Sequence, residues 1–151
     1  MINDILMQEK EYTFSCFTHQ DAYYIGQNII NQIQESHAKP VRIRITLHND
    51  IVFQYLMEGK TGETWLDKKQ RTVEKFKHSS YYIYLQNEEN HQYDYLKDQY
   101  SICGGGFPIT VNHQVIGSIC VSGLQHNQDH QLIIYALQCL KEKRKEELKK
   151  C

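Results

Sequence analysis

Five short segments of the chain alternate hydrophobic with polar positions, which is the pattern of strands that bury one face. They span residues 12–17, 41–47, 51–57, 107–111 and 115–121. In 41–47, every odd-numbered position is apolar and every even-numbered position is polar. Short turns separate the second segment from the third and the fourth from the fifth, and turns of this length join antiparallel strands. The pattern therefore predicts a five-stranded antiparallel sheet.

Apolar residues spaced three and four positions apart predict helices between these strands. The predicted helices cover residues 2–10, 22–33, 64–77 and 81–86, and a last one begins near residue 127 or 129. Residues that favour helix N-caps precede three of them: Thr18 or Asp21, Ser79 or Ser80, and Asn127 or Asp129. Gly26 lies inside the second helix, where it costs about 1 kcal/mol relative to alanine, so we expect close contact between helix and sheet there. The polar tract 87–97 is expected to be a surface loop or a fraying helix end.

Helices before, between and after the strands indicate an α+β domain, with the sheet in two layers or in α/β/α layers. The 151 residues fit a single domain, 1–151, and such a length buries roughly 70% of the unfolded surface. Hydrophobic residues make up 40% and charged residues 23%, with two prolines, so the composition is that of a folded chain.

The charge balance argues against nucleic acid as a partner. Seventeen basic and eighteen acidic side chains give a net charge of −1, and the charged tail 141–150 is interpreted as a solvated helix end. No apolar run is long enough for a membrane span, and no leader pattern opens the chain, so we expect a cytoplasmic protein. The five cysteines contain no CxxC pair, which favours reduced thiols over a disulfide framework or a metal centre.

The stretch from Cys103 to His130 carries the candidate chemistry. Gly104, Gly105 and Gly106 allow positive φ angles and close approach to backbone N–H groups, as anion sites require, although a structural bulge is the alternative. Cys103 beside them is a weak candidate nucleophile with His126 or His130 as its base, and a small buried apolar side chain is the alternative.

Two further pairs of residues have both a functional and a structural interpretation. Asp129 suits a helix N-terminus, while His130 beside it could face a pocket and bind metal or haem. Ser79 and Ser80, which follow several lysines, either help to hold an anionic group or only cap the next helix.

An ordered set of motifs resembles a small protein family in the haem-degrading-domain superfamily, related to GlcG and HbpS. The set consists of Trp65 with Lys68 and Lys69, Thr72-Val73, Phe76, Ser79-Ser80, the run from Gly104 to Ile109, Gly117, the run from Val121 to Leu124, and Asp129-His130. The resemblance implies a profilin-like fold, in which a five-stranded antiparallel sheet lies between helices. It also implies homo-oligomers, as dimers or assemblies of dimers, and haem or another anionic small molecule as ligand. The candidate ligand-binding residues are Trp65, Lys68, Ser79, Ser80, Gly104, Gly105, Gly106, Phe107, Ser122, Gly123, Asp129 and His130.

Two positions depart from the family pattern. Cys103 stands where the family usually has histidine, so a thiolate replaces an imidazole if that histidine is a ligand in relatives. Gln125 stands where the family usually has proline. Three functional hypotheses follow: an oligomeric small-ligand-binding module without established catalysis, an oligomeric scaffold without a ligand, and a cysteine-dependent enzyme using Cys103.

Overall fold

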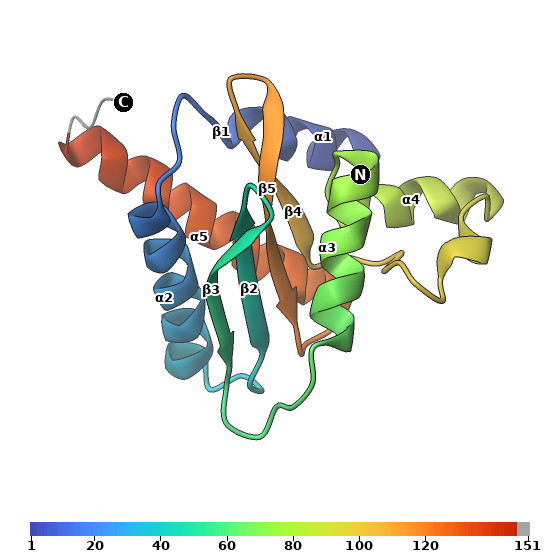
Figure 1. The fold of residues 1–151 in the computed structure, drawn as a ribbon, viewed down its shortest axis with the longest axis horizontal. Helices are drawn as coiled ribbons and strands as arrows, with labels where there is room; N and C mark the ends of the chain where they lie inside the picture. Colours follow the sequence, from blue (N-terminus) through green and yellow to red (C-terminus); the bar gives the residue numbers. More distant parts are fainter. Residues whose placement is uncertain (148–151) are drawn as a thin grey trace.

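One mixed sheet of five strands, in the order β1-β4-β5-β2-β3, forms the centre of the computed structural model, which describes residues 1–147 (Figure 1). The strands are β1 (Thr13–Phe14), β2 (Arg42–Leu47), β3 (Asp50–Leu56), β4 (Gly106–Val111) and β5 (Gln114–Ser122). Neighbouring strands are antiparallel, as expected, except that β1 runs parallel to β4. The α+β class and the five strands are confirmed. A uniformly antiparallel sheet was wrong for β1, because some ninety residues connect it to β4 and no tight turn fixes its direction.

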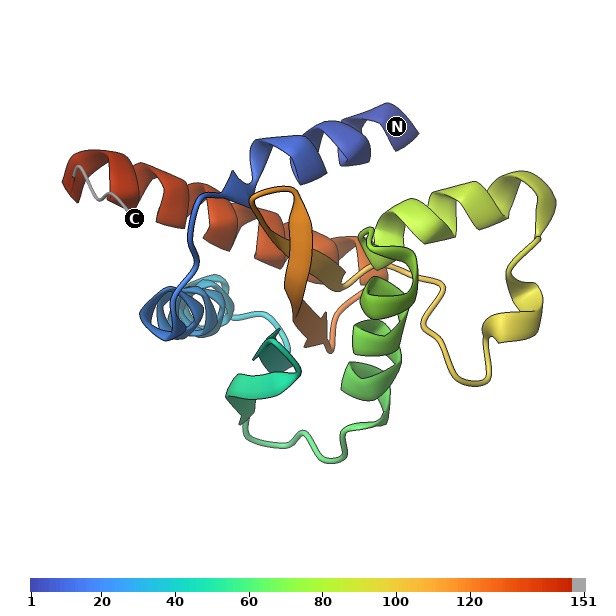
Figure 2. The same ribbon diagram turned by 45° about the horizontal axis from the view of Figure 1, so that its top comes forward.

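Helices cover both faces of this sheet (Figures 1 and 2). They are α1 (Ile2–Glu11), α2 (His19–Ser36), α3 (Thr64–Phe76), α4 (Ser80–Asn90), the 3₁₀ turn η1 (Asp94–Leu96) and α5 (His126–Glu147). In Figure 1, α3 lies in front of the sheet and α5 crosses behind it, while α2 stands beside β3. The arrangement is therefore α/β/α, with α2 and α5 on one face and α3 on the other.

Two helices have boundaries that differ from those predicted from the sequence. The helix after Ser79 continues through Asn87 to Asn90, because the buried Asn87 amide donates to Asp94 Oδ1 and its oxygen accepts from Tyr93 N. The last helix begins at His126, so Asp129 lies in its first turn and Asn127 is already helical. Of the tail 141–150, residues 148–150 lie outside the described residues.

The face of the sheet toward α2 and α5 holds the apolar core. Its strand residues occupy alternate positions and are almost fully buried: Ile43, Ile45, Phe107, Ile109, Ile119 and Val121. Apolar stripes of the two helices cover them, at Ile25, Ile29, Ile33, Ile133, Ala136, Leu137 and Leu140. The spacing that predicted these stripes is therefore the spacing that packs against the sheet.

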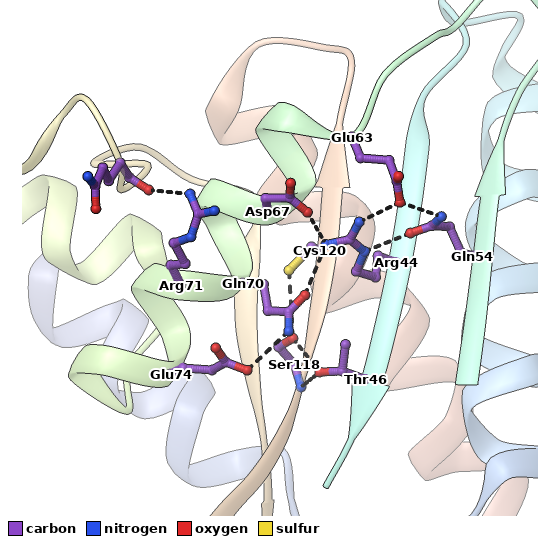
Figure 3. Close-up of polar contacts among 11 residues, drawn as sticks. Arg44, Thr46, Gln54, Glu63, Asp67, Gln70, Arg71, Glu74, Ser118 and Cys120 are labelled. Carbon is purple, nitrogen blue, oxygen red and sulfur yellow. Dashed lines mark hydrogen bonds and ion pairs between the residues drawn. The ribbon is translucent and has the colours of Figure 1, made fainter. Parts of the chain in front are cut away.

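The opposite face is polar, as the alternation in β2 indicates, yet α3 buries it (Figure 3). Arg44 is only 4% exposed, and its guanidinium donates to Gln54, Glu63, Asp67 and Gln70 at 2.6–3.0 Å. These acceptors come from β3, from α3 and from Glu63 just before α3. A buried charge requires such partners, so this network holds α3 against β2 and β3.

Candidate functional site

An open pocket of about 300 Å³ lies where β5 ends, β2 begins and α5 starts. We call it the sheet-end pocket. Its lining residues are Arg42, Trp65, Lys69, Cys103, Ser122, Gly123, Leu124, His126 and Asp129. Six of the candidate residues from the sequence analysis thus share one pocket: Trp65, Cys103, Ser122, Gly123, His126 and Asp129.

A buried ion pair occupies the inner side of the pocket. Lys69 Nζ lies 3.2 Å from Asp129 Oδ2 and donates to the carbonyl oxygen of Val121 at 2.6 Å. Both side chains are less than 5% exposed. Two charges that are removed from water need close partners, and Lys69 and Asp129 provide these for each other.

Asp129 organises the turn that precedes its own helix. Its carboxylate accepts hydrogen bonds from Leu124 N at 2.9 Å and from Gly123 N at 3.4 Å. Burial raises the pKa of the Asp129 carboxyl, while Lys69 and the two backbone N–H groups act in the opposite direction. The N–H groups of Gly123 and Leu124 are therefore engaged by Asp129.

His126 has a defined tautomer. Its Nδ1 accepts a hydrogen bond from Gly104 N at 2.8 Å, which places the ring proton of the neutral imidazole on Nε2. Burial and the nearby charge of Lys69 lower the pKa of His126, so the ring is neutral at pH 7. The imidazole ring packs against the rings of Tyr81 and Tyr84, with centroid distances of 5.3 and 4.5 Å.

Cys103 is a half-buried free thiol in the wall of the pocket. Its sulfur lies 3.1 Å from Ser101 Oγ. Cys120 differs, because it is fully buried and burial raises the pKa of its thiol to about 11. Among the described cysteines, Cys103 is the one that lines this pocket.

The glycine triplet allows close packing beside the pocket. A Cβ on Gly104 would lie 2.5 Å from the His126 carbonyl oxygen, and one on Gly105 would overlap Lys69 Nζ. Gly105 also has φ +119°, a conformation that L-residues rarely adopt. Gly106 N donates to Ser80 Oγ at 2.9 Å. Two N–H groups of the triplet, those of Gly104 and Gly106, are therefore already bound within the chain, and Gly105 makes room for the lysine.

The pocket lining also includes the aromatic Trp65 and the cationic Arg42, and Lys68, which is not a lining residue, lies beside Trp65. Trp65 is 47% exposed, and Lys68 Nζ lies 4.9 Å from its ring centroid. Arg42 Nε and Nη2 both donate to the Thr61 carbonyl oxygen, at 3.0 and 2.7 Å. Within residues 1–147 the Arg42 guanidinium has no carboxylate partner.

Eight residues of the predicted ligand set do not line the pocket. Lys68 contacts the lining residue Trp65, and the glycine triplet packs against the lining residues His126 and Lys69. The other four have different contacts. Phe107 belongs to the apolar core, and Ser79 caps α4 by accepting from Tyr82 N. Ser80 is buried and holds Gly106 N, as described above. His130 is 2% exposed and lies beneath α1, where its Nε2 is 2.7 Å from Gln8 Oε1. The structure thus gives these four residues packing and capping contacts.

Lys69 and Arg42 were absent from the predicted ligand set. A sequence signal existed for Lys69, since it lies three residues after Leu66 and four before Val73, within the apolar stripe of its helix. A lysine in such a stripe is buried or reaches a pocket. Arg42 offered no such signal, because its position depends on how β2 meets the loop that carries Thr61.

The expectation of reduced thiols is confirmed for Cys103, Cys120 and Cys139, which are free. It is wrong for Cys16, which is disulfide-bonded, and Cys151 lies outside the described residues. Within residues 1–147, no cluster of three His, Cys, Asp or Glu side chains is arranged to hold a metal ion. None of the helices in this part of the chain has the length and apolarity needed to cross a bilayer.

Comparison with known proteins gives consistent matches along most of the chain. The sequence model of the family described as "Haem degrading protein HbpS-like" matches residues 17–138. A UPF0303 protein of Psychromonas ingrahamii is 35% identical over 144 residues, covering 90% of each chain. A UPF0303 protein of Streptomyces avermitilis is 33% identical over 147 residues, covering 91% of this chain and 88% of the relative.

Solved structures share the fold. Ybr137w superposes with a TM-score of 0.85 at 25% identity, covering 95% of this chain and 89% of its own. PduOC, solved as a heme complex, gives 0.68 at 18% identity and covers 82% of this chain and 94% of its own. HbpS gives 0.66 at 15% identity, with 82% and 89% covered. At such identities the last two similarities establish a common fold.

Proposed function

The chain belongs to the HbpS-like haem-degrading protein family, and we propose that it is a small-ligand-binding module whose sheet-end pocket takes haem or a similar planar carboxylate. The observation that carries this proposal is that Arg42 and Trp65 line the same pocket. A guanidinium without a carboxylate partner suits an anionic group, and an exposed indole offers a flat apolar surface. Haem has both a flat ring and propionate groups.

The heme complex of the structurally similar PduOC supports haem over other planar anions. The donor set in this chain fits a haem group with sulfur as the iron ligand. His126 is engaged through Nδ1 and carries its proton on Nε2, so neither nitrogen is free to bind iron in this arrangement. Within the described residues, Cys103 sulfur has one hydrogen-bond contact, with the Ser101 hydroxyl at 3.1 Å, and where that hydroxyl is the donor the sulfur keeps lone pairs for iron. A thiolate-ligated haem would supply a redox-active iron, with its potential set by that ligand.

The roles of the protein residues follow from their contacts. Arg42 would bind a carboxylate of the ligand, Trp65 would cover part of its ring, and Lys69 with Asp129 would keep the inner wall rigid. His130 has no part in this proposal, because α1 covers it and the pocket excludes it.

We assign no catalytic step to Cys103. A thiol nucleophile needs a base that can accept its proton, and the Nδ1 lone pair of His126 is already used by Gly104 N. The binding of a ligand at Cys103 requires no such base. The cysteine-dependent enzyme is thus the less favoured hypothesis.

We also propose that the protein self-associates, as the family resemblance implies. In the scaffold alternative the same residues would serve assembly without any ligand. One measurement distinguishes the two hypotheses. Only the binding module should shift the Soret band of hemin, and it should do so without a change in oligomeric state.

The test is a titration of hemin into the purified full chain, followed by the Soret band. We expect a saturable shift, and Arg42→Gln should weaken binding by about tenfold, the loss of one charge-assisted hydrogen bond. Arg71→Gln is the matched control, since Arg71 also donates to a backbone carbonyl, that of Gln99, but lies outside the pocket.

Cysteine variants test the iron ligand in the same titration. Cys103→Ser should abolish the spectral features of thiolate ligation, whereas Cys139→Ser, which removes another free thiol, should retain them. A wild-type protein without a Soret shift would contradict haem binding. A shift that Cys103→Ser leaves unchanged would contradict cysteine ligation alone.

A further inference from the structure

The outer edge of β3 has no strand partner within the described residues. β3 is the last strand of the sheet and pairs only with β2, through residues 42–47 (Figure 1). The edge of a sheet carries backbone N–H and C=O groups that can pair with another chain. An unprotected edge strand is thus a natural place for a second strand to add.

Natural proteins usually protect such an edge with charge, proline or a bulge. The run from Ile51 to Met57 contains neither a charged residue nor a proline. A bulge is present, where the register shifts between Ile45 and Thr46, but it lies near the start of β3. The stretch from Phe53 to Leu56 keeps a regular register and remains open to pairing.

Apolar side chains are exposed on both faces of this strand. Ile51 is 52% exposed and lies opposite Thr46, on the face toward α3. Tyr55 is 47% exposed and lies opposite Ile43, on the face toward α2. A partner docking on one face would cover only one of them, whereas an added strand brings side chains to both faces.

Helix α2 continues the same surface. Tyr23 of α2 is 55% exposed and packs edge-on against Phe53, with ring centroids 6.2 Å apart. A groove of about 370 Å³ runs between α2 and β3, lined by Gln27, Ile30, Gln34, Phe53, Gln54 and Tyr55. Every lining residue is uncharged.

We propose that the outer edge of β3 pairs antiparallel with β3 of a second copy of this chain, which joins the two five-stranded sheets into one. The inference rests on the self-association included in the proposed function and names the surface that mediates it.

The sequence of the edge suits a copy of itself. A twofold axis at Gln54 keeps each face of the joined sheet continuous and sets Phe53 of each copy opposite Tyr55 of the other. Aromatic pairs directly across two strands stabilise a sheet. The uncharged run 51–57 also meets its own copy over its whole length without like-charge repulsion, which charged residues within it would impose.

Multi-angle light scattering of the full chain tests the inference. The wild type should have a mass that is an even multiple of the 17.9 kDa chain. Tyr55→Lys should lower that mass by at least half, because a lysine on an edge strand opposes pairing. Tyr135→Lys on α5 is the matched control: Tyr135 is 48% exposed, and its replacement should leave the mass unchanged.

Hydrogen exchange on the wild type gives a second measurement that needs no variant. Backbone amides of 53–56 should exchange several-fold more slowly in the associated protein than after dilution to the monomer. An effect confined to other segments would place the interface elsewhere and overturn the inference.

The other possible results of these experiments also test whether β3 mediates association. A monomeric wild type at all concentrations, or a Tyr55→Lys protein of unchanged mass, would overturn the inference. Loss of association with a full Soret response to hemin would support it, since Tyr55 lies outside the sheet-end pocket. If the wild type does not bind hemin but still associates through β3, the proposal of haem binding is contradicted and the proposed interface is supported.

Discussion

His130 was a candidate ligand in the sequence, and its burial in the fold changes its chemistry. Its ring lies against Tyr81 and Phe107, with centroids 5.0 and 5.9 Å away, and Gln8 of α1 contacts Nε2. Its Nδ1 is buried without a hydrogen-bond partner within the described residues. Burial, with a smaller effect of His126, lowers the pKa of His130 from 6.5 to about 4.

This lowered pKa predicts a pH-dependent stability. Between pH 6.5 and 4 the unfolded chain binds a proton that the folded chain does not, so the free energy of unfolding falls as the pH falls. The loss attributable to His130 should approach about 3 kcal/mol near pH 4. Urea unfolding at several pH values should show the dependence in the wild type and a smaller one in His130→Gln.

His19→Gln, which replaces an exposed histidine, is the control for this comparison. The difference between variants is needed because His78 contributes with the opposite sign: its hydrogen bond to Glu9 raises its pKa. Equal pH dependence in His130→Gln and the wild type would contradict the assignment.

The Lys69–Asp129 pair predicts a large effect of a single substitution. Lys69→Met leaves the Asp129 carboxylate buried without its cation, which should lower the free energy of unfolding by about 3–5 kcal/mol. Adding Asp129→Asn should recover much of the loss, because the amide oxygen still accepts from Leu124 N. Denaturant unfolding of both variants measures this.

The neighbouring lysine provides the control. Lys68 is partly exposed, and within the described part of the chain its ammonium contacts the Lys97 carbonyl oxygen and the Trp65 ring, so Lys68→Met should change stability by no more than about 0.5 kcal/mol. Equal losses for the two lysines would show that the buried pair is not the cause.

At the scale of elements, α2 is fixed to the sheet by its start and by one glycine. Thr18 and Asp21 form a reciprocal capping box, so the two candidate caps act together. A Cβ on Gly26 would overlap the ring of Phe53 on β3. The close contact expected from a glycine inside a helix is therefore found at this position.

The contact predicts that Gly26→Ala destabilises the protein although alanine favours helix. Overpacking costs about 1–3 kcal/mol and the gain in helix propensity is about 1 kcal/mol, so a net loss near 1 kcal/mol is expected. In a Phe53→Leu background the same change should be neutral or stabilising. A stabilising Gly26→Ala in the wild-type background, measured by thermal unfolding, would refute the contact argument.

At the scale of the whole molecule, ligand binding and folding are linked. A ligand that binds only the folded chain stabilises it by about 2.7 kcal/mol at 100 times its dissociation constant. Hemin at that excess should therefore raise the unfolding midpoint of the wild type in urea. Arg42→Gln at the same hemin concentration should show a smaller increase, and an unchanged wild-type midpoint would count against specific binding.

The sequence by itself determined the elements and their buried faces. Alternation in β2 and the three- and four-residue spacing in α2 and α5 depend on neighbours along the chain, so they can be read without a structure. Several residues of the family motifs also gather at one end of the sheet, since Trp65, Cys103, Ser122, Gly123 and Asp129 line the same pocket.

Only the tertiary structure decided which distant side chains meet. Lys69 pairs with Asp129 across 60 positions, Gln8 covers His130 across 122, and β1 runs parallel to β4. No local pattern encodes these contacts, because each depends on the packing of elements whose relative placement is set by burial of the whole core. For that reason the sequence predicted both Asp129 and His130 as ligands, and the fold left only Asp129 in the pocket.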